Sequence, residues 1–128
     1  MIDKIIIILN IEYFKGTLHG SALVGDNLIT DTASSEKELE EKIHEVILNY
    51  HDLKPSEYFL HKKFYLSYFF AKFDFLKINK VAELSGINPS LLRQYVMGKK
   101  NPSEKQVLKV KAAINKIILE LSISEICN

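Results

Sequence analysis

The chain has 128 residues, of which 47% are hydrophobic, and its formal net charge is +1. This length allows one compact domain or two small ones, and no apolar run approaches the roughly 20 residues that span a bilayer. Cys127 is the only cysteine, which excludes an internal disulfide. The first nine residues do not resemble a signal peptide. We therefore expect a cytoplasmic protein that does not contact a membrane.

The N-terminal half predicts three strands, a helix and a fourth strand. Gly16 and Gly20 are expected to break the chain after the first strand. Gly25-Asp26-Asn27 is a strong turn signal between the second and third strands. The strands are expected at residues 4–11, 21–24, 28–30 and 57–65, and the helix at residues 36–50.

The predicted helix has a defined start and an amphipathic pattern. Ser34 or Ser35 can cap it, and Glu38 supports a capping box with Ser35. The apolar residues recur at helical spacing, while the acidic residues line the opposite face. We expect these acids to be solvated, because side chains that spread around a helix cannot converge on one metal ion. The apolar residues are Leu39, Ile43, Val46, Ile47 and Tyr50.

Residues 78–102 predict two short helices joined by a tight turn and followed by a basic loop. Gly86 can adopt the positive φ that such a turn needs. Asn88 is a suitable N-cap for the second helix, and Pro89 fits its first position. Gly98 is expected to end this helix. The inward-facing residues are expected to be Val81, Ala82, Leu84, Leu91, Leu92 and Tyr95.

The loop resembles a stretch of the Cro/repressor-type helix-turn-helix family, in which Gly-Lys-x-Asn-Pro-Ser follows the recognition helix. Arg93 and Gln94 are the candidate base-reading residues, because their side chains can pair with guanine and adenine edges. Solvated surface residues are the alternative interpretation of both. The matching stretch is Gly98-Lys99-Lys100-Asn101-Pro102-Ser103, and the candidate DNA contacts are Asn88, Ser90, Arg93, Gln94, Lys99, Lys100 and Asn101.

The last part of the chain, residues 103–121, predicts a long helix with more apolar surface than one small domain needs. We therefore expect a homodimer or a higher oligomer. The aromatic residues between positions 65 and 75 are expected to belong to the core, in the first helix of a DNA-binding unit.

Charge is divided unevenly along the chain. Residues 1–74 carry 8 basic and 12 acidic residues, a net charge of −4, and residues 75–128 carry 9 basic and 4 acidic residues, a net charge of +5. The basic part can gain affinity by releasing counterions from phosphates. The acidic part would repel DNA and suits a basic protein partner.

The order of the predicted elements, followed by the helix-turn-helix pattern, resembles the HicB-type antitoxins of bacterial toxin–antitoxin pairs. The stretch that carries this resemblance runs from Tyr65-Leu-Ser-Tyr-Phe-Phe into Gly86-Ile-Asn-Pro-Ser-Leu-Leu-Arg-Gln-Tyr. The family's common Asp-Leu-Pro-Gly turn is replaced here by Gly25-Asp26-Asn27-Leu28. The resemblance implies an α+β chain with a partial ribonuclease-H-like βββαβ domain at residues 1–64, which binds a small ribonuclease toxin. It also implies an all-α helix-turn-helix domain at residues 65–128, which binds operator DNA.

The four histidines are scattered along the chain and no second ligand stands at metal-binding spacing, so we expect no catalytic residues, metal or cofactor. The expected function is an antitoxin that represses its own operon. The alternative is a helix-turn-helix transcriptional regulator with a ligand-sensing or dimerising N-terminal domain and no toxin partner. A third interpretation is an adaptor whose helix-turn-helix contacts protein.

Overall fold

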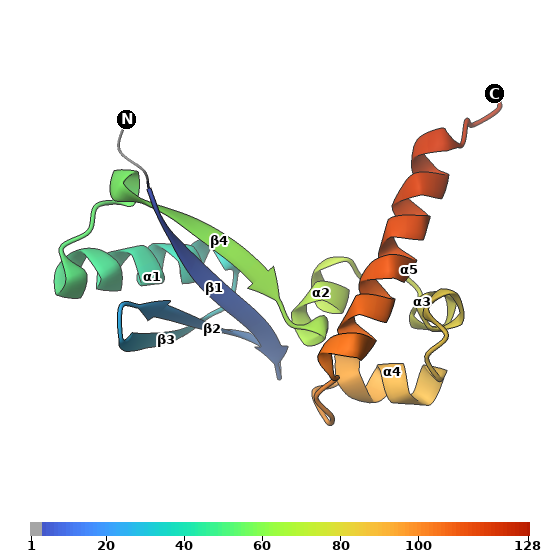
Figure 1. Cartoon of the computed structure of the whole chain (residues 1–128), viewed down its shortest axis with the longest axis horizontal. Coiled ribbons are helices and arrows are strands. Elements are labelled where there is room, and N and C mark those ends of the chain that lie inside the picture. Colours follow the sequence, from blue (N-terminus) through green and yellow to red (C-terminus); the bar gives the residue numbers. More distant parts are fainter. Residues whose placement is uncertain (1–3) are drawn as a thin grey trace. The chain divides into compact units, whose positions relative to one another are not determined.

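The computed structural model describes residues 4–128 and has two compact units, which divide between Lys72 and Phe73. The first unit combines a sheet with helices, and the elements described in the second unit are helices (Figure 1). The expected α+β class is therefore confirmed. The division falls after Lys72, whereas the sequence suggested a boundary after Phe64.

Helix α2 (Leu66–Lys72) accounts for this difference, because it packs on the sheet of the first unit. Tyr68 belongs to the same buried cluster as the sheet residues. The backbone N–H of Tyr13 donates to Ser67 Oγ at 3.0 Å. The aromatic residues expected in the core are divided: Tyr68 and Phe70 are buried, whereas Tyr65 and Phe75 are 53% and 74% exposed.

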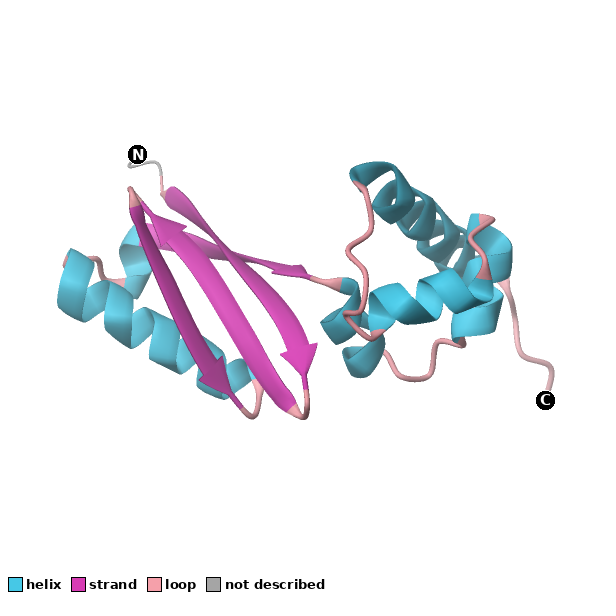
Figure 2. Cartoon of the chain, turned by 90° about the horizontal axis from the view of Figure 1, so that it is seen from below, coloured by secondary structure: helices cyan, strands magenta, loops and turns pink. Residues whose placement is uncertain are grey.

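The first unit is built on a four-stranded mixed sheet in the order β3-β2-β1-β4. Figure 2 shows the strands of this sheet in magenta with a helix along one face. Strand β1 pairs with β2 antiparallel and with β4 parallel, and β2 pairs with β3 antiparallel. Helix α1 (Glu36–His51) and the 3-10 turn η1 (Pro55–Glu57) connect β3 to β4. The strand bounds are Ile5–Phe14 for β1, Thr17–Val24 for β2, Asn27–Ala33 for β3 and Tyr58–Phe64 for β4.

Gly16 and Gly20, which were both expected to break the chain, have different roles in the structure. Lys15 and Gly16 have φ values of 50° and 79° and form the two-residue turn between β1 and β2, as a type I′ hairpin requires. The expectation that Gly20 also breaks the chain is wrong, because Gly20 lies inside β2. A Cβ at this position would lie 2.9 Å from Leu39 Cδ2, so the missing side chain lets α1 approach the sheet closely.

Helix α1 lies along one face of the sheet and supplies one side of the core. Its N-cap is Ser35, whose hydroxyl accepts a hydrogen bond from the Glu38 N–H at 3.2 Å. The Glu38 carboxylate accepts from the N–H and hydroxyl of Ser34, which differs from the capping box expected with Ser35. The buried residues are Leu39, Ile43 and Ile47 of α1 with Ile7, Leu9, Ile11, Leu18, Ala22, Val24, Ile29, Ala33 and Tyr58 of the sheet.

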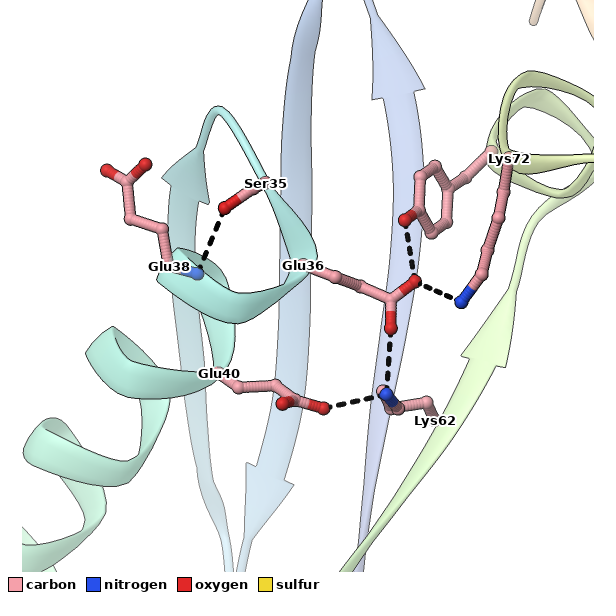
Figure 3. A network of polar contacts seen from close by, with 7 residues as sticks. Ser35, Glu36, Glu38, Glu40, Lys62 and Lys72 are labelled. Atoms are coloured by element: carbon pink, nitrogen blue, oxygen red, sulfur yellow. Dashed lines mark hydrogen bonds and ion pairs between the residues drawn. The ribbon is translucent and has the colours of Figure 1, made fainter.

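A charged network joins α1, β4 and α2 beside this core (Figure 3). Lys62 Nζ lies 2.7 Å from a Glu36 oxygen and 2.8 Å from a Glu40 oxygen. Glu36 Oε1 also accepts hydrogen bonds from Lys72 Nζ and the Tyr68 hydroxyl, each at 2.6 Å. Partial burial raises the pKa of Glu36, but the hydrogen bonds from Lys62, Lys72 and Tyr68 together lower it more strongly, to about 2. The network therefore holds α2 to the first unit through an ionised carboxylate.

The second unit contains α3 (Ile78–Ser85), α4 (Pro89–Val96) and α5 (Glu104–Ile123). Helix α3 contacts both α4 and α5. Leu84 and Leu91, which were expected to face inward, are only partly buried. The buried side chains are Val81, Ala82, Ile87, Leu92, Tyr95, Val110 and Ala113.

The network of Glu36 makes the stability of the first unit depend on pH. Because its folded pKa lies below the ordinary value of 4.5, ionised Glu36 contributes its full stabilisation above pH 4.5 and loses it as the pH falls toward 2. We expect Glu36→Gln to remove this dependence and to cost on the order of 1 kcal/mol at neutral pH, after screening by solvent. Urea denaturation as a function of pH measures the effect. Glu41→Gln, at an exposed position of the same helix, is the control, and parallel profiles for Glu36→Gln and wild type would contradict the assignment.

Candidate nucleic-acid interface

The turn between α3 and α4 has the local chemistry that the sequence predicts. Gly86 ends α3 with a φ of 74°, in the left-handed region that favours glycine. Asn88 is the N-cap of α4, and its side-chain oxygen accepts a hydrogen bond from the Ser90 N–H at 2.9 Å. Pro89 occupies the first helical position, where no N–H is needed.

One side of α4 is buried, and the opposite side carries candidate contact residues. Leu92 and Tyr95 are 0% and 9% exposed. Ser90 and Arg93 are exposed, and Gln94 is half-buried. Because Ser90 stands three and four positions before Arg93 and Gln94, the three side chains share one face of the helix. The structure therefore brings these three candidates together.

The basic loop after α4 is anchored to the last turn of that helix. Gly98 has a φ of 75°, and the N–H groups of Lys99 and Lys100 donate to the carbonyl oxygen of Gln94 at 2.9 Å and 3.3 Å. The side chains of Lys99, Lys100 and Asn101 are exposed. Two lysines and an amide thus follow the C-terminal end of α4 directly, while Asn88 stands at its N-terminal end.

Arg93 is held by a residue that the sequence did not single out. Its Nη2 donates a hydrogen bond to Oδ1 of Asn79, which lies in the first turn of α3. This bond uses one of the five guanidinium donors and restricts the side chain, while other donors stay available to a ligand. The spacing of residues in the sequence could not predict this contact. Helical periodicity relates residues of one helix, whereas Asn79 belongs to α3 and Arg93 to α4.

The second unit as a whole is basic. Residues 73–128 carry 9 basic and 5 acidic residues, a net charge of +4. In the part of the chain that the structure describes, Lys80 and Glu83 form the ion pair of the second unit, at 3.9 Å. No carboxylate among the described residues lies within ion-pair distance of Arg93, Lys99 or Lys100. Such side chains can replace counterions on a phosphate backbone.

Side chains that could hold a metal ion do not gather anywhere in residues 4–128, since no suitable group of three or more His, Cys, Asp or Glu residues is present there. Across the same residues, no helix has both the length and the apolar character needed to cross a bilayer. The chain matches no protein-family model, no curated protein and no solved structure.

Proposed function

We propose that this chain is a cytoplasmic antitoxin that neutralises a small ribonuclease toxin through its first unit and represses its own operon through its second unit. The observation that carries the proposal is the exposed side of α4. Three polar side chains share one face of a capped helix, and two lysines without carboxylate partners among the described residues follow it. This combination suits recognition of base edges together with phosphates.

In this proposal the second unit is a helix-turn-helix, and α4 is the helix that enters the major groove. Arg93 would pair with a guanine edge and Gln94 with an adenine edge. The bond from Arg93 to Asn79 supports this role, because a side chain that is already restricted loses less freedom on binding. The residues proposed to contact phosphates, or in the case of Ser90 a base, are Asn88, Ser90, Lys99, Lys100 and Asn101.

The topology and charge of the first unit support the antitoxin role. Three antiparallel strands, a helix and a strand parallel to β1 form the order expected of a partial ribonuclease-H-like fold. Residues 1–72 carry 8 basic and 11 acidic residues, a net charge of −3. A negative unit disfavours DNA and favours a basic protein. We therefore assign the toxin to the first unit and the operator to the second.

Helix α5 is proposed to join two copies of the chain. Its buried residues, Val110 and Ala113, lie in its N-terminal half, and α3 contacts the helix. Further along, Ile118, Leu119 and Leu121 are 56%, 61% and 69% exposed. Burial of this surface between two copies would remove it from water. A two-fold dimer would also present two α4 helices to a palindromic site, about 34 Å apart.

A transcriptional regulator without a toxin partner is the second candidate. A hollow of ≈ 420 Å³ on the first unit is lined by polar residues and offers space for a small ligand. An adaptor that binds protein is the third candidate, and in that case the bond between Arg93 and Asn79 would serve only to hold α3 and α4 together. A toxin encoded beside this chain would favour the antitoxin over the regulator without a toxin partner. Binding to DNA would argue against the adaptor.

Binding to the DNA upstream of the operon tests the second unit. We expect Arg93→Ala to cost about 1–3 kcal/mol and to relax sequence preference at one base pair. The double variant Lys99→Ala/Lys100→Ala should weaken binding to all sequences and reduce the salt slope by about 1 for each phosphate that is no longer neutralised. Gel shifts at several salt concentrations measure both effects, with Lys54→Ala in the first unit as the control. Unchanged binding of Arg93→Ala would remove Arg93 as a reader, and no binding by wild type would contradict the DNA role.

The oligomeric state tests α5. We expect wild type to be a dimer at micromolar concentration in light scattering, and Ile118→Glu/Leu121→Glu to be a monomer, because charges would then lie in the apolar contact. Lys116→Glu changes the charge of the same helix on its other side and should leave the dimer intact. A wild-type monomer would count against the proposed dimer.

Neutralisation of a toxin tests the first unit. Co-expression of the full chain with the small basic protein encoded beside it should restore growth, and the purified chain should block RNA cleavage by that protein. Arg93→Ala is the matched control, since a change on the DNA-binding surface should leave neutralisation unaffected. A neighbouring protein that is neither toxic nor bound by this chain would contradict the antitoxin role.

A further inference from the structure

Strand β3 forms one edge of the sheet, because β2 is its only partner among the described strands. Val24 and Asn27 lie opposite each other across a two-residue turn, so they form the first hydrogen-bonded pair of this hairpin. In an antiparallel ladder such pairs alternate with pairs that are not hydrogen-bonded. The backbone N–H and C=O groups of Leu28, Thr30 and Thr32 therefore point away from β2, toward the free edge.

A free edge of this kind is a template for a strand of another molecule. The strand that is always present at the same concentration is β3 of a second copy. In an antiparallel pair with two-fold symmetry, Thr30 of one copy would lie opposite Thr30 of the other, and Leu28 would lie opposite Thr32. Residues that face each other in this way exchange both of their N–H···O=C bonds. The complete contact therefore needs the backbone groups of Thr32 as well as those of Leu28 and Thr30.

Both backbone groups of Thr32 are already occupied within the first unit. The C=O of Thr32 accepts a hydrogen bond from Nζ of Lys42, a residue of α1, at 2.8 Å. The N–H of Thr32 donates to Oδ1 of Asp31 at 2.8 Å. A second copy could not pair at Thr32 without breaking these bonds, and its Leu28 would lose its partner. Only the pair formed by the two Thr30 residues would remain.

The side chain of Asp31 opposes the same pairing in a second way. Side chains alternate along a strand, so Asp31 lies on the side of the sheet that carries the buried residues Ile29 and Ala33. In the two-fold pair, Asp31 would lie opposite Ile29 of the other copy. A carboxylate in that position would lose hydration beside an apolar side chain without gaining a partner. Inward-pointing charges on edge strands are one of the means by which proteins prevent edge-to-edge pairing.

The two edges of the sheet differ in how they are protected. Strand β4, at the other edge, contains Lys62 and Lys63, and lysines within an edge strand disfavour pairing with another chain. Strand β3 contains neither a lysine nor a proline. Protection of β3 must therefore come from Asp31 and from a residue outside the strand, which is Lys42.

We propose that Lys42 and Asp31 are an autoinhibitory guard of the β3 edge, which prevents a second copy from extending the sheet by strand pairing. The guard acts by occupying the backbone of Thr32. Lys42 also lies 3.4 Å from a carboxylate oxygen of Glu38, one helical turn before it, and this contact restricts the lysine side chain. The inference concerns β3 alone and does not depend on a toxin, on DNA or on α5.

The mass of the full chain in light scattering tests the guard. We expect Lys42→Met/Asp31→Val to have about twice the mass of wild type or more at the same concentration, because two copies can then pair along β3. Lys42→Arg keeps a donor and Asp31→Asn keeps an acceptor, so both should have the mass of wild type. Lys37→Met, at an exposed position of α1, is the matched control for the loss of a lysine.

Thr30→Pro identifies the surface on which the copies meet. Proline has no N–H, and the N–H of Thr30 points to the free edge, so this change removes no hydrogen bond within the sheet. Added to Lys42→Met/Asp31→Val, it should return the mass to that of wild type.

Two results would overturn the guard. One is a wild-type mass for Lys42→Met/Asp31→Val at an unchanged melting temperature, and the other is a larger mass that Thr30→Pro does not reverse. If the double variant unfolds, Lys42→Met alone replaces it and is judged by the same two results, since the Lys42 side chain is 42% exposed and tolerates substitution. Each mass is compared with that of wild type, so the result is decisive whether or not α5 joins two copies.

Discussion

Strand β1 has an antiparallel neighbour on one side and a parallel neighbour on the other, and the architecture of the first unit follows from this pairing. A hairpin cannot connect parallel strands, so the chain must cross the sheet between β3 and β4. Helix α1 makes that crossing, and Gly20 provides the space for Leu39 to reach the sheet. One face of the sheet is thereby buried, and the side chains that alternate with the buried ones point away from α1.

The ion pairs of Glu36 join the last two elements of the first unit, β4 and α2, to helix α1. Lys62 comes from the strand that the crossover reaches, and Lys72 comes from the helix that follows it. Both lysines neutralise acids of α1 and join that helix to β4 and α2. The first unit is negative overall, with 8 basic and 11 acidic residues among residues 1–72, whereas residues 73–128 of the second unit carry a net charge of +4.

The second unit depends on tertiary contacts more than on helix propensity. Helices α3 and α4 have 8 residues each, and helices of this length are marginal in isolation. The Asn88 cap stabilises α4 locally, and the burial of Leu92 stabilises it through tertiary packing. The same packing brings Asn79 to Arg93, so the residue that would hold the proposed base reader is chosen by the way two helices cross.

The sequence by itself determined the order of the elements, the amphipathic face of α1, and the turn at Gly86 with its Asn88 cap. These features depend on residues only a few positions apart, where periodicity and turn chemistry are decisive. Only the tertiary structure decided that Gly20 lies within a strand, that α2 belongs to the first unit, and that Arg93 is bound to Asn79. Arg93 and Asn79 are 14 positions apart in the sequence, and Lys72 and Glu36 are 36 positions apart. Such partners are selected by packing between separate elements, which a local sequence pattern cannot predict.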